Sequence, residues 1–193
     1  MAKRHSLRSL WESAPTADST STCILAIGES GQHLVIQPSV LRTFTNHRQL
    51  RSDAPEAGGQ LFARIDGANI LLELATGPRK SDKRSRYSYQ PDRRAEQEEI
   101  DQLHRENLLF VGDWHTHPES IPNPSPQDIA SIRDSVAKSR HHLKGFLLII
   151  VGTGAIPTTL WVGLHSTTES LQLVPLPHER SEMMTNTGVL PQP

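Results

Sequence analysis

The sequence predicts a single domain of the α/β (α+β) class, in which helices pack against one sheet. Two observations support this prediction. Apolar runs of strand length alternate with segments whose apolar residues recur at helical spacing. The chain has 193 residues, which is room for one sizeable core and short tails. We therefore predict a domain at residues 23–175, between a flexible N-terminal segment at 1–22 and a polar C-terminal tail at 176–193.

The first half of the domain is predicted to hold two hairpins and a helix. Strands at residues 23–27 and 33–36 flank a turn that contains glycines. Pro38 suits the first position of a helix whose apolar residues follow at helical spacing: Val40, Leu41 and Phe44. A second hairpin joins strands at residues 60–65 and 70–75.

The second half begins with a polar stretch at residues 79–94, where positive charge concentrates. Its cations are Arg79, Lys80, Lys83, Arg84, Arg86, Arg93 and Arg94. Such a stretch is either a solvated loop or a guide for an acidic or extended substrate. The remaining pattern predicts, in order, a helix at 92–105, a strand at 108–115, a helix that begins at Ser125, and strands at 145–151, 158–164 and 171–174.

Charge and composition exclude several classes of protein. The formal net charge is −1, so no global field attracts nucleic acid or an acidic membrane, and neither is an expected partner. No apolar run approaches the roughly 20 residues that span a bilayer, and the N-terminus lacks the apolar core of a secretion signal. The single cysteine, Cys23, cannot form an internal disulfide. These features fit a cytoplasmic protein.

Two histidines and an aspartate form a candidate metal site. His115 and His117 are two residues apart at the end of a predicted strand, so both side chains face the same side. Asp128 follows eleven residues later, after a loop that contains three prolines at 118–124. Two imidazoles and one carboxylate suit Zn²⁺ better than Mg²⁺ or Ca²⁺ and leave one position open. An open zinc position is typical of a hydrolase.

Ser125 combines a structural feature with a possible chemical one. It is a good N-cap, Pro126 suits the first helical position, and Asp128 falls three residues after the cap. We therefore place Asp128 in the first turn of a helix.

The general base must come from another part of the chain. Glu56 is the best candidate, because it precedes two glycines that lead into a strand and permit close approach of the backbone to a ligand. The alternative is a surface glutamate at a turn. Asp113 and Glu119 are nearer in sequence, but we expect them to face away from the metal or to lie in the loop.

With both halves of the site in view, the chain resembles the JAMM, or MPN-plus, metallopeptidases. The resemblance rests on Glu56-Ala57-Gly58-Gly59, His115-Thr116-His117-Pro118 and Ser125-Pro126-Gln127-Asp128. It implies a cytidine-deaminase-like fold with a central mixed sheet flanked by helices. It also implies one zinc ion held by His115, His117 and Asp128, with Glu56 as general base and Ser125 as a contact to the oxyanion.

Further motifs are similar to those of one bacterial subgroup, encoded beside ubiquitin-like conjugation machinery in CBASS anti-phage operons: EAGGQLF at 56–62, ATGP at 75–78, YQPDR at 89–93 and VGDWHTHPE at 111–119. This resemblance implies a deubiquitinase-like isopeptidase. Its substrate would be a protein with an extended C-terminal tail, a cGAS-like nucleotidyltransferase joined to a target, and an E1/E2-like conjugating enzyme is a possible partner.

Three alternatives remain open. The first is a deconjugase or processing protease of another bacterial ubiquitin-like system. The second is a non-catalytic scaffold of the MPN type, which the filled ligand positions disfavour. The third is a metal-dependent hydrolase of small amides or nucleotides.

Overall fold

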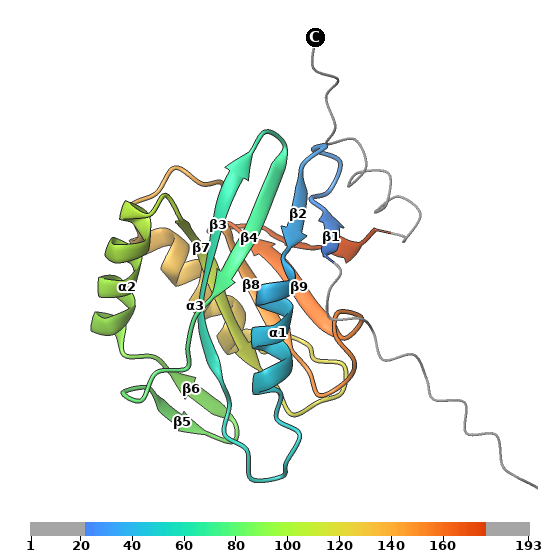
Figure 1. The fold of residues 1–193 in the computed structure, drawn as a ribbon, viewed down its shortest axis with the longest axis vertical. Helices are drawn as coiled ribbons and strands as arrows, with labels where there is room; N and C mark the ends of the chain where they lie inside the picture. The colour runs from blue at the N-terminus through green and yellow to red at the C-terminus, as the bar shows by residue number, and fades with distance from the viewer. Residues whose placement is uncertain (1–21, 177–193) are drawn as a thin grey trace, which may run out of the picture.

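The computed structural model describes residues 22–176 (Figure 1). The predictions for the N-terminal segment and the C-terminal tail fall outside this range, apart from Thr22 and Leu176. Within the range, the chain forms three helices, a nine-stranded sheet and a separate two-stranded hairpin. None of the helices in this part of the chain is long and apolar enough to cross a membrane.

The sheet is mixed, as the family resemblance implies. Its strand order is β10-β9-β8-β7-β3-β4-β2-β1-β11, with parallel pairs β2–β4 and β7–β8 and antiparallel pairs elsewhere. The bounds are β1 Cys23–Ala26, β2 His33–Ile36, β3 Gly58–Asp66, β4 Asn69–Ala75, β7 Leu109–Thr116, β8 Phe146–Val151, β9 Leu160–His165, β10 Ser170–Gln172 and β11 Val174–Pro175. The helices are α1 Pro38–His47, α2 Arg93–Arg105 and α3 Pro126–Lys138.

Strand β8 shows how the helices cover both faces of the sheet. All six of its residues are buried. Phe146, Leu148 and Ile150 pack with Ile132 of α3, whereas the alternate residues pack in the cluster that contains α1. Figure 1 accordingly shows α1 in front of the sheet and α3 behind it. A strand covered on both faces is apolar throughout, which is why this run is so easy to recognise in the sequence.

Helix α2 begins where the sequence predicts. The Asp92 carboxylate accepts hydrogen bonds from the backbone N–H groups of Arg94 and Ala95, at 3.1 and 3.3 Å, so it caps the first turn. The apolar side of the helix packs through Leu103 against Phe62. The helix thereby covers the part of the sheet beside β7.

The prediction for the last strand is wrong in one respect. The sequence predicts a single strand at 171–174, but the structure divides it between the two outer positions of the sheet. Gln172 pairs with Gly163 of β9, and Val174 pairs with Ala26 of β1. Leu173, between them, is buried and donates its backbone N–H to the Val162 carbonyl. The sheet therefore curls until its two outer strands are joined by one residue.

A second difference lies in the basic stretch. Residues predicted only as polar form a two-stranded hairpin of β5 (Lys83–Ser85) and β6 (Ser88–Gln90). These strands have no alternation of apolar and polar residues, so hydrophobic patterning gives no signal for them.

Gly112 lies where the central strands β7 and β8 pack too closely to admit a side chain. Its φ is +144°, and a Cβ at this position would lie 2.0 Å from the Leu147 carbonyl oxygen on β8. Gly67, in the β3–β4 turn, also has a positive φ, but a Cβ there meets nothing within 4 Å. We expect Gly67→Ala to lower the free energy of unfolding by about 1–2 kcal/mol and Gly112→Ala by at least twice as much. Urea denaturation measures both; equal losses would contradict the packing described for β7 and β8.

Candidate metal centre

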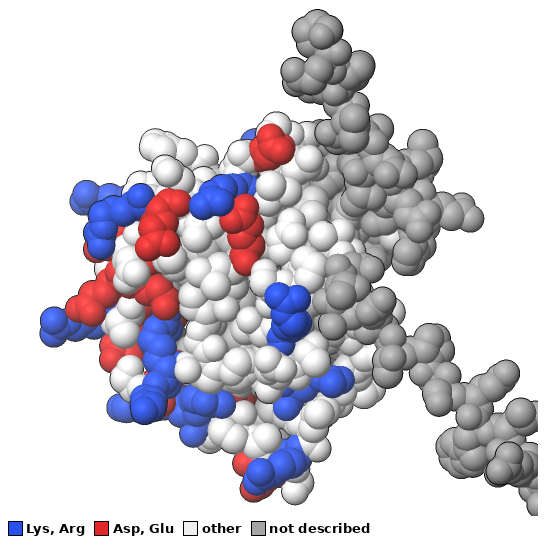
Figure 2. Space-filling model, in the orientation of Figure 1, with Lys and Arg blue, Asp and Glu red and all other residues white. Residues whose placement is uncertain are grey.

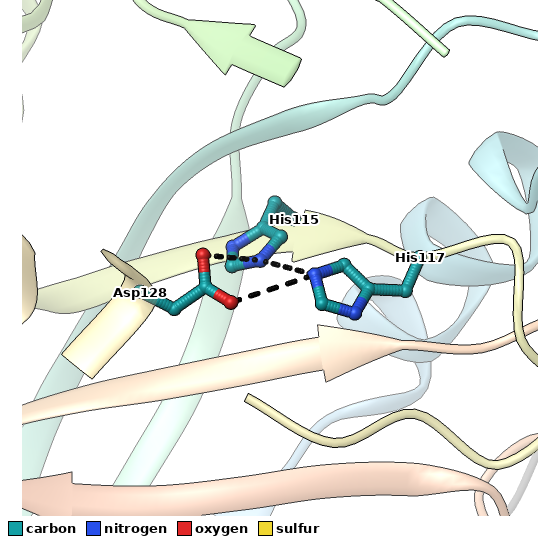
Figure 3. Close-up of side chains that lie close together, drawn as sticks. All are labelled: His115, His117 and Asp128. Carbon is teal, nitrogen blue, oxygen red and sulfur yellow. Dashed lines mark hydrogen bonds and ion pairs between the residues drawn. The ribbon is translucent and has the colours of Figure 1, made fainter. Parts of the chain in front are cut away.

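His115, His117 and Asp128 converge on one point (Figure 3). The two histidine Nε2 atoms are 3.1 Å apart. The Asp128 carboxylate lies 3.4 Å from Nε2 of His115 and 3.5 Å from Nε2 of His117. All three side chains are mostly buried, with 13%, 13% and 17% exposed. The predicted set of three ligands is thus brought together as one cluster.

The end of β7 presents both histidines. Trp114 and Thr116 alternate with them and are buried on the opposite face, as strand geometry requires. Beyond the last residue of the strand, His117 stays in line with the sheet, because its backbone N–H donates to the Val151 carbonyl of β8 at 3.0 Å. The two candidate ligands therefore lie at the end of a strand that is paired on both sides, with β3 and with β8.

A capping box at the start of α3 positions the aspartate. The Ser125 hydroxyl accepts from the Asp128 N–H at 3.2 Å, and the Asp128 carboxylate accepts from the Ser125 N–H at 2.7 Å. The same carboxylate faces the histidines. Helix initiation and ligand placement thus depend on one pair of residues.

The donor set fits zinc. Four-coordinate zinc with bonds of about 2.0–2.1 Å places its ligand atoms roughly 3.3–3.4 Å apart. The two histidine nitrogens are 3.1 Å apart, and each lies 3.4 or 3.5 Å from a different oxygen of the Asp128 carboxylate, which is close to that value. Two imidazole nitrogens and one carboxylate oxygen are also the ligand types of catalytic zinc sites, which leave the fourth position to water or substrate.

The charges around the cluster favour an ionised carboxylate. Burial alone would raise the pKa of Asp128, but hydrogen bonds from His115 and His117 together outweigh burial and hold this pKa far below its usual range. For His117, burial acts to lower the pKa, and the neighbouring carboxylate of Asp128 outweighs it, so the pKa is raised. The Asp128 carboxylate is therefore ionised and available to bind a cation.

Glu119 lies in the loop, as expected, and its side chain also contacts one of the candidate ligands. Its carboxylate lies 3.2 Å from Nδ1 of His117, the ring nitrogen that does not face the cluster. A carboxylate at this position fixes the orientation and tautomer of a metal-binding histidine. The alternation of strand residues gives no information about a contact across this loop.

Glu56 lines the same cavity as the three ligands. In the antiparallel ladder Gly58 pairs with His115, and extending this register by two residues places Glu56 opposite His117. The side chain is 7% exposed, so it is not a surface glutamate. Burial raises its pKa to about 7, although His117 acts in the opposite direction.

The β5–β6 hairpin holds the backbone of Glu56 on both sides. The Glu56 N–H donates to the Ser85 carbonyl at 2.7 Å, and the Arg84 guanidinium donates to the Glu56 carbonyl. Arg86 reaches the Ser52 carbonyl in the same loop. Arg84 and Arg86 therefore have structural partners, and the stretch forms an exposed hairpin where a loop was one of the two expectations.

Other cations of the stretch pair with acids of α2. Arg79 pairs with Glu99, Arg93 with Glu96, and Arg94 with Glu98. Figure 2 shows acidic and basic side chains interleaved over α2 on this side of the molecule. Three of the seven cations of the stretch are thus paired with carboxylates.

Gln49 is a residue of the site that sequence reasoning missed. Its amide nitrogen donates to the carbonyls of Ala54 and Arg86, at 3.1 and 2.9 Å, and its amide oxygen accepts from the Thr116 hydroxyl at 3.0 Å. That hydroxyl in turn accepts from the Ala57 N–H at 2.9 Å. One buried amide therefore ties the histidine strand to the loop of the candidate base and to the hairpin. A single glutamine after a helix carries no sequence signal for this.

The cavity over the cluster has a volume of about 620 Å³. It is bordered by the ligands, by Glu56 and Ser125, and by the hairpin residues Tyr87 to Gln90. Asp113 also lines it, so the expectation that Asp113 faces away from the metal site is wrong. Burial raises the pKa of Asp113 to about 7. Its place two residues before His115 on a strand could have indicated the shared face.

The pKa of Glu56 leads to a stability prediction for the metal-free protein. A folded pKa of about 7, above the ordinary 4.5, means that wild-type protein loses stability as pH rises through this interval. Glu56→Gln removes the buried charge. Between pH 5 and pH 8 we expect the variant to gain about 1–3 kcal/mol in unfolding free energy relative to wild type.

Urea denaturation of metal-stripped protein at the two pH values measures this difference. The exposed Glu29→Gln is the control and should follow wild type at both. A difference between Glu56→Gln and wild type that does not change with pH would contradict the buried position of the carboxylate.

Comparisons with known proteins agree with the geometry. The chain is 37% identical over 123 residues to a protein named CD-NTase/cGAS isopeptidase from Pseudomonas aeruginosa, an alignment that covers 61% of this chain and 76% of that protein. A protein of the same name from Vibrio cholerae is 31% identical over 129 residues, covering 64% of this chain and 79% of the relative. A solution structure of a protein from Desulfitobacterium hafniense aligns with a TM-score of 0.50 at 19% identity, over 72% of this chain and 87% of the other.

The solved structure bears on the fold alone and confirms the predicted fold class. A family model described as prokaryotic homologs of the JAB domain matches residues 13–163, a range that contains Glu56, both histidines, Ser125 and Asp128. The chain therefore belongs to the prokaryotic JAB family, as its motifs predict.

Proposed function

We propose that the protein is a zinc-dependent isopeptidase, which hydrolyses the bond between the C-terminus of a conjugated cGAS-like nucleotidyltransferase and its target in a bacterial CBASS anti-phage system. The observation that carries the proposal is the convergence of His115, His117 and Asp128 in one cavity with the buried Glu56. The names of the relatives support the class of bond and of substrate.

His115, His117 and Asp128 are the residues that would hold the zinc ion. When bound, Zn²⁺ supplies Lewis acidity, which lowers the pKa of water from about 15.7 to about 7 and polarises a carbonyl. The chain itself supplies the ligand geometry, the exclusion of bulk water and the groups that move protons.

Glu56 is the group that moves the proton. Its carboxylate is buried beside His117, and in the metal-free protein burial raises its pKa to about 7. A carboxylate with a raised pKa can accept a proton and return it near neutral pH. In the proposed reaction Glu56 takes a proton from the attacking water and passes it to the leaving lysine amine. The hairpin contacts that hold its backbone limit its motion during this transfer.

Ser125 is suited to hold the developing oxyanion. Its hydroxyl oxygen accepts the Asp128 N–H, which leaves the hydroxyl proton available for donation. A preorganised donor of this kind stabilises a transition state by about 3–4 kcal/mol. The capping role and the catalytic role are therefore compatible.

The substrate tail is proposed to lie extended beside the β5–β6 hairpin. Tyr87, Ser88 and Tyr89 line the cavity, and a short strand edge can pair with an extended peptide. A cytoplasmic location and an E1/E2-like partner remain predictions from the sequence. A deconjugase of another ubiquitin-like system would use the same groups, whereas a scaffold would not need this ligand set.

Two substitutions separate the base from the ligands. Glu56→Gln is expected to lower cleavage by about 10²–10⁴-fold while the protein keeps its zinc, because Glu56 moves a proton but binds no metal. His117→Ala is expected to lose both zinc and cleavage. The measurements are zinc content and cleavage of a nucleotidyltransferase C-terminus fused to a reporter protein.

The exposed Glu29→Gln serves as the matched control and should cleave at the wild-type rate. Near-normal turnover by Glu56→Gln would falsify the assignment of the base. A wild-type protein that retains activity after complete removal of metal would exclude the metallopeptidase mechanism.

A further inference from the structure

A groove leads away from the metal cluster along β7. The cavity over the cluster adjoins a second one of about 210 Å³, and both are lined by Asp113, Glu96 and Arg93. The second cavity is bounded by Gln97 and Ile100 of α2 and by Ser135 of α3. The space beside the scissile bond thus continues between the two helices.

Asp113 stands where the two cavities meet. It lies two residues before His115 on the same face of β7, so the two Cα atoms are roughly 6–7 Å apart. The side chain is half-buried and borders both cavities. Within residues 22–176 its carboxylate has no hydrogen-bond or ion-pair partner among the side chains.

The neighbouring charges leave this carboxylate unmatched. Glu96 is paired with Arg93 at 2.9 Å and lies 4.0 Å from Arg79, and Arg79 also pairs with Glu99. Three carboxylates therefore share two guanidinium groups. The Arg93 side chain is 68% exposed, so it lies at the rim and does not fill the groove. A cationic group from a bound substrate would give the third carboxylate a partner.

One wall beside Asp113 is apolar. Ile132 of α3 and Leu148 of β8 line the cavity and belong to one packed cluster. A passage with an apolar wall and a carboxylate suits a side chain with a long methylene stem and a positively charged end. Only lysine and arginine combine these two features.

We propose that Asp113 is a specificity-determining residue, whose carboxylate receives the ammonium or guanidinium group of a substrate Lys or Arg close to the scissile bond. This inference rests on the proposed isopeptidase function and names one requirement of its substrate. Asp113 acts on the choice of substrate and takes no part in the proton transfer carried by Glu56.

The test is a position scan of the reporter fusion. Each of the three residues on either side of the scissile bond is set in turn to Lys, Arg, Gln or Glu, and kcat/KM is measured for each substrate. For wild-type protein we expect one position at which Lys or Arg exceeds Gln by about tenfold and Glu falls below Gln. In Asp113→Asn the ratio of Lys to Gln at that position should fall to about one, whatever the absolute rate.

Asp113→Glu keeps the carboxylate and should retain a preference for the cation, and Asp101→Asn, an exposed aspartate of α2, should keep the full ratio. A wild-type enzyme that cleaves the fusions with the same kcat/KM for Lys, Gln and Glu at every position overturns the inference and leaves the proposed function standing. The same holds if Asp113→Asn retains the wild-type ratio. Failure of wild-type protein to cleave any fusion overturns the proposed function and this inference with it.

Discussion

The antiparallel register between β3 and β7 is the constraint on which the site depends. Gly58 stands opposite His115, and the Thr116 N–H donates to the Ala57 carbonyl at 2.8 Å. This pairing joins two segments far apart in the chain and sets Glu56 opposite His117. Because strand side chains alternate between faces, a slip of one residue would turn Glu56 away from the histidines. Gln49 and the β5–β6 hairpin reinforce this register from outside the sheet, so the position of the candidate base and the pairing of the sheet depend on the same hydrogen bonds.

At the start of α3, one residue of the capping box is also a candidate metal ligand. The Asp128 carboxylate completes a capping box with Ser125 and also faces both histidines. A residue that initiates a helix is held in place by that helix, so the candidate ligand Asp128 is positioned by the fold itself. The Glu119 carboxylate adds the same kind of support to His117.

The sequence was sufficient where local chemistry decides the structure and insufficient where contacts are distant. Strand β8 is apolar throughout, and Ser125 and Asp128 have the spacing of a capping box, so both were predictable. The β5–β6 hairpin was not, because Arg84 is fixed by the carbonyl of Glu56, which lies on another part of the chain. The division of the predicted strand at 171–174 was not predictable either, because its two halves pair with β9 and β1, which are distant from each other in sequence. The contact of Glu119 with His117 and the bonds of Gln49 likewise exist only in three dimensions.

The segment around Leu173 also determines which backbone groups the sheet leaves unpaired at its two edges. Open sheets present unpaired backbone groups on their outer strands, and these invite pairing with other chains. Here both outer positions are filled by strands of three and two residues, from one short segment. Loss of that segment would uncover β9 and β1 at the same moment. Residues 170–175 therefore supply both outer strands of the nine-stranded sheet, and outer strands this short offer few backbone groups for pairing with another chain.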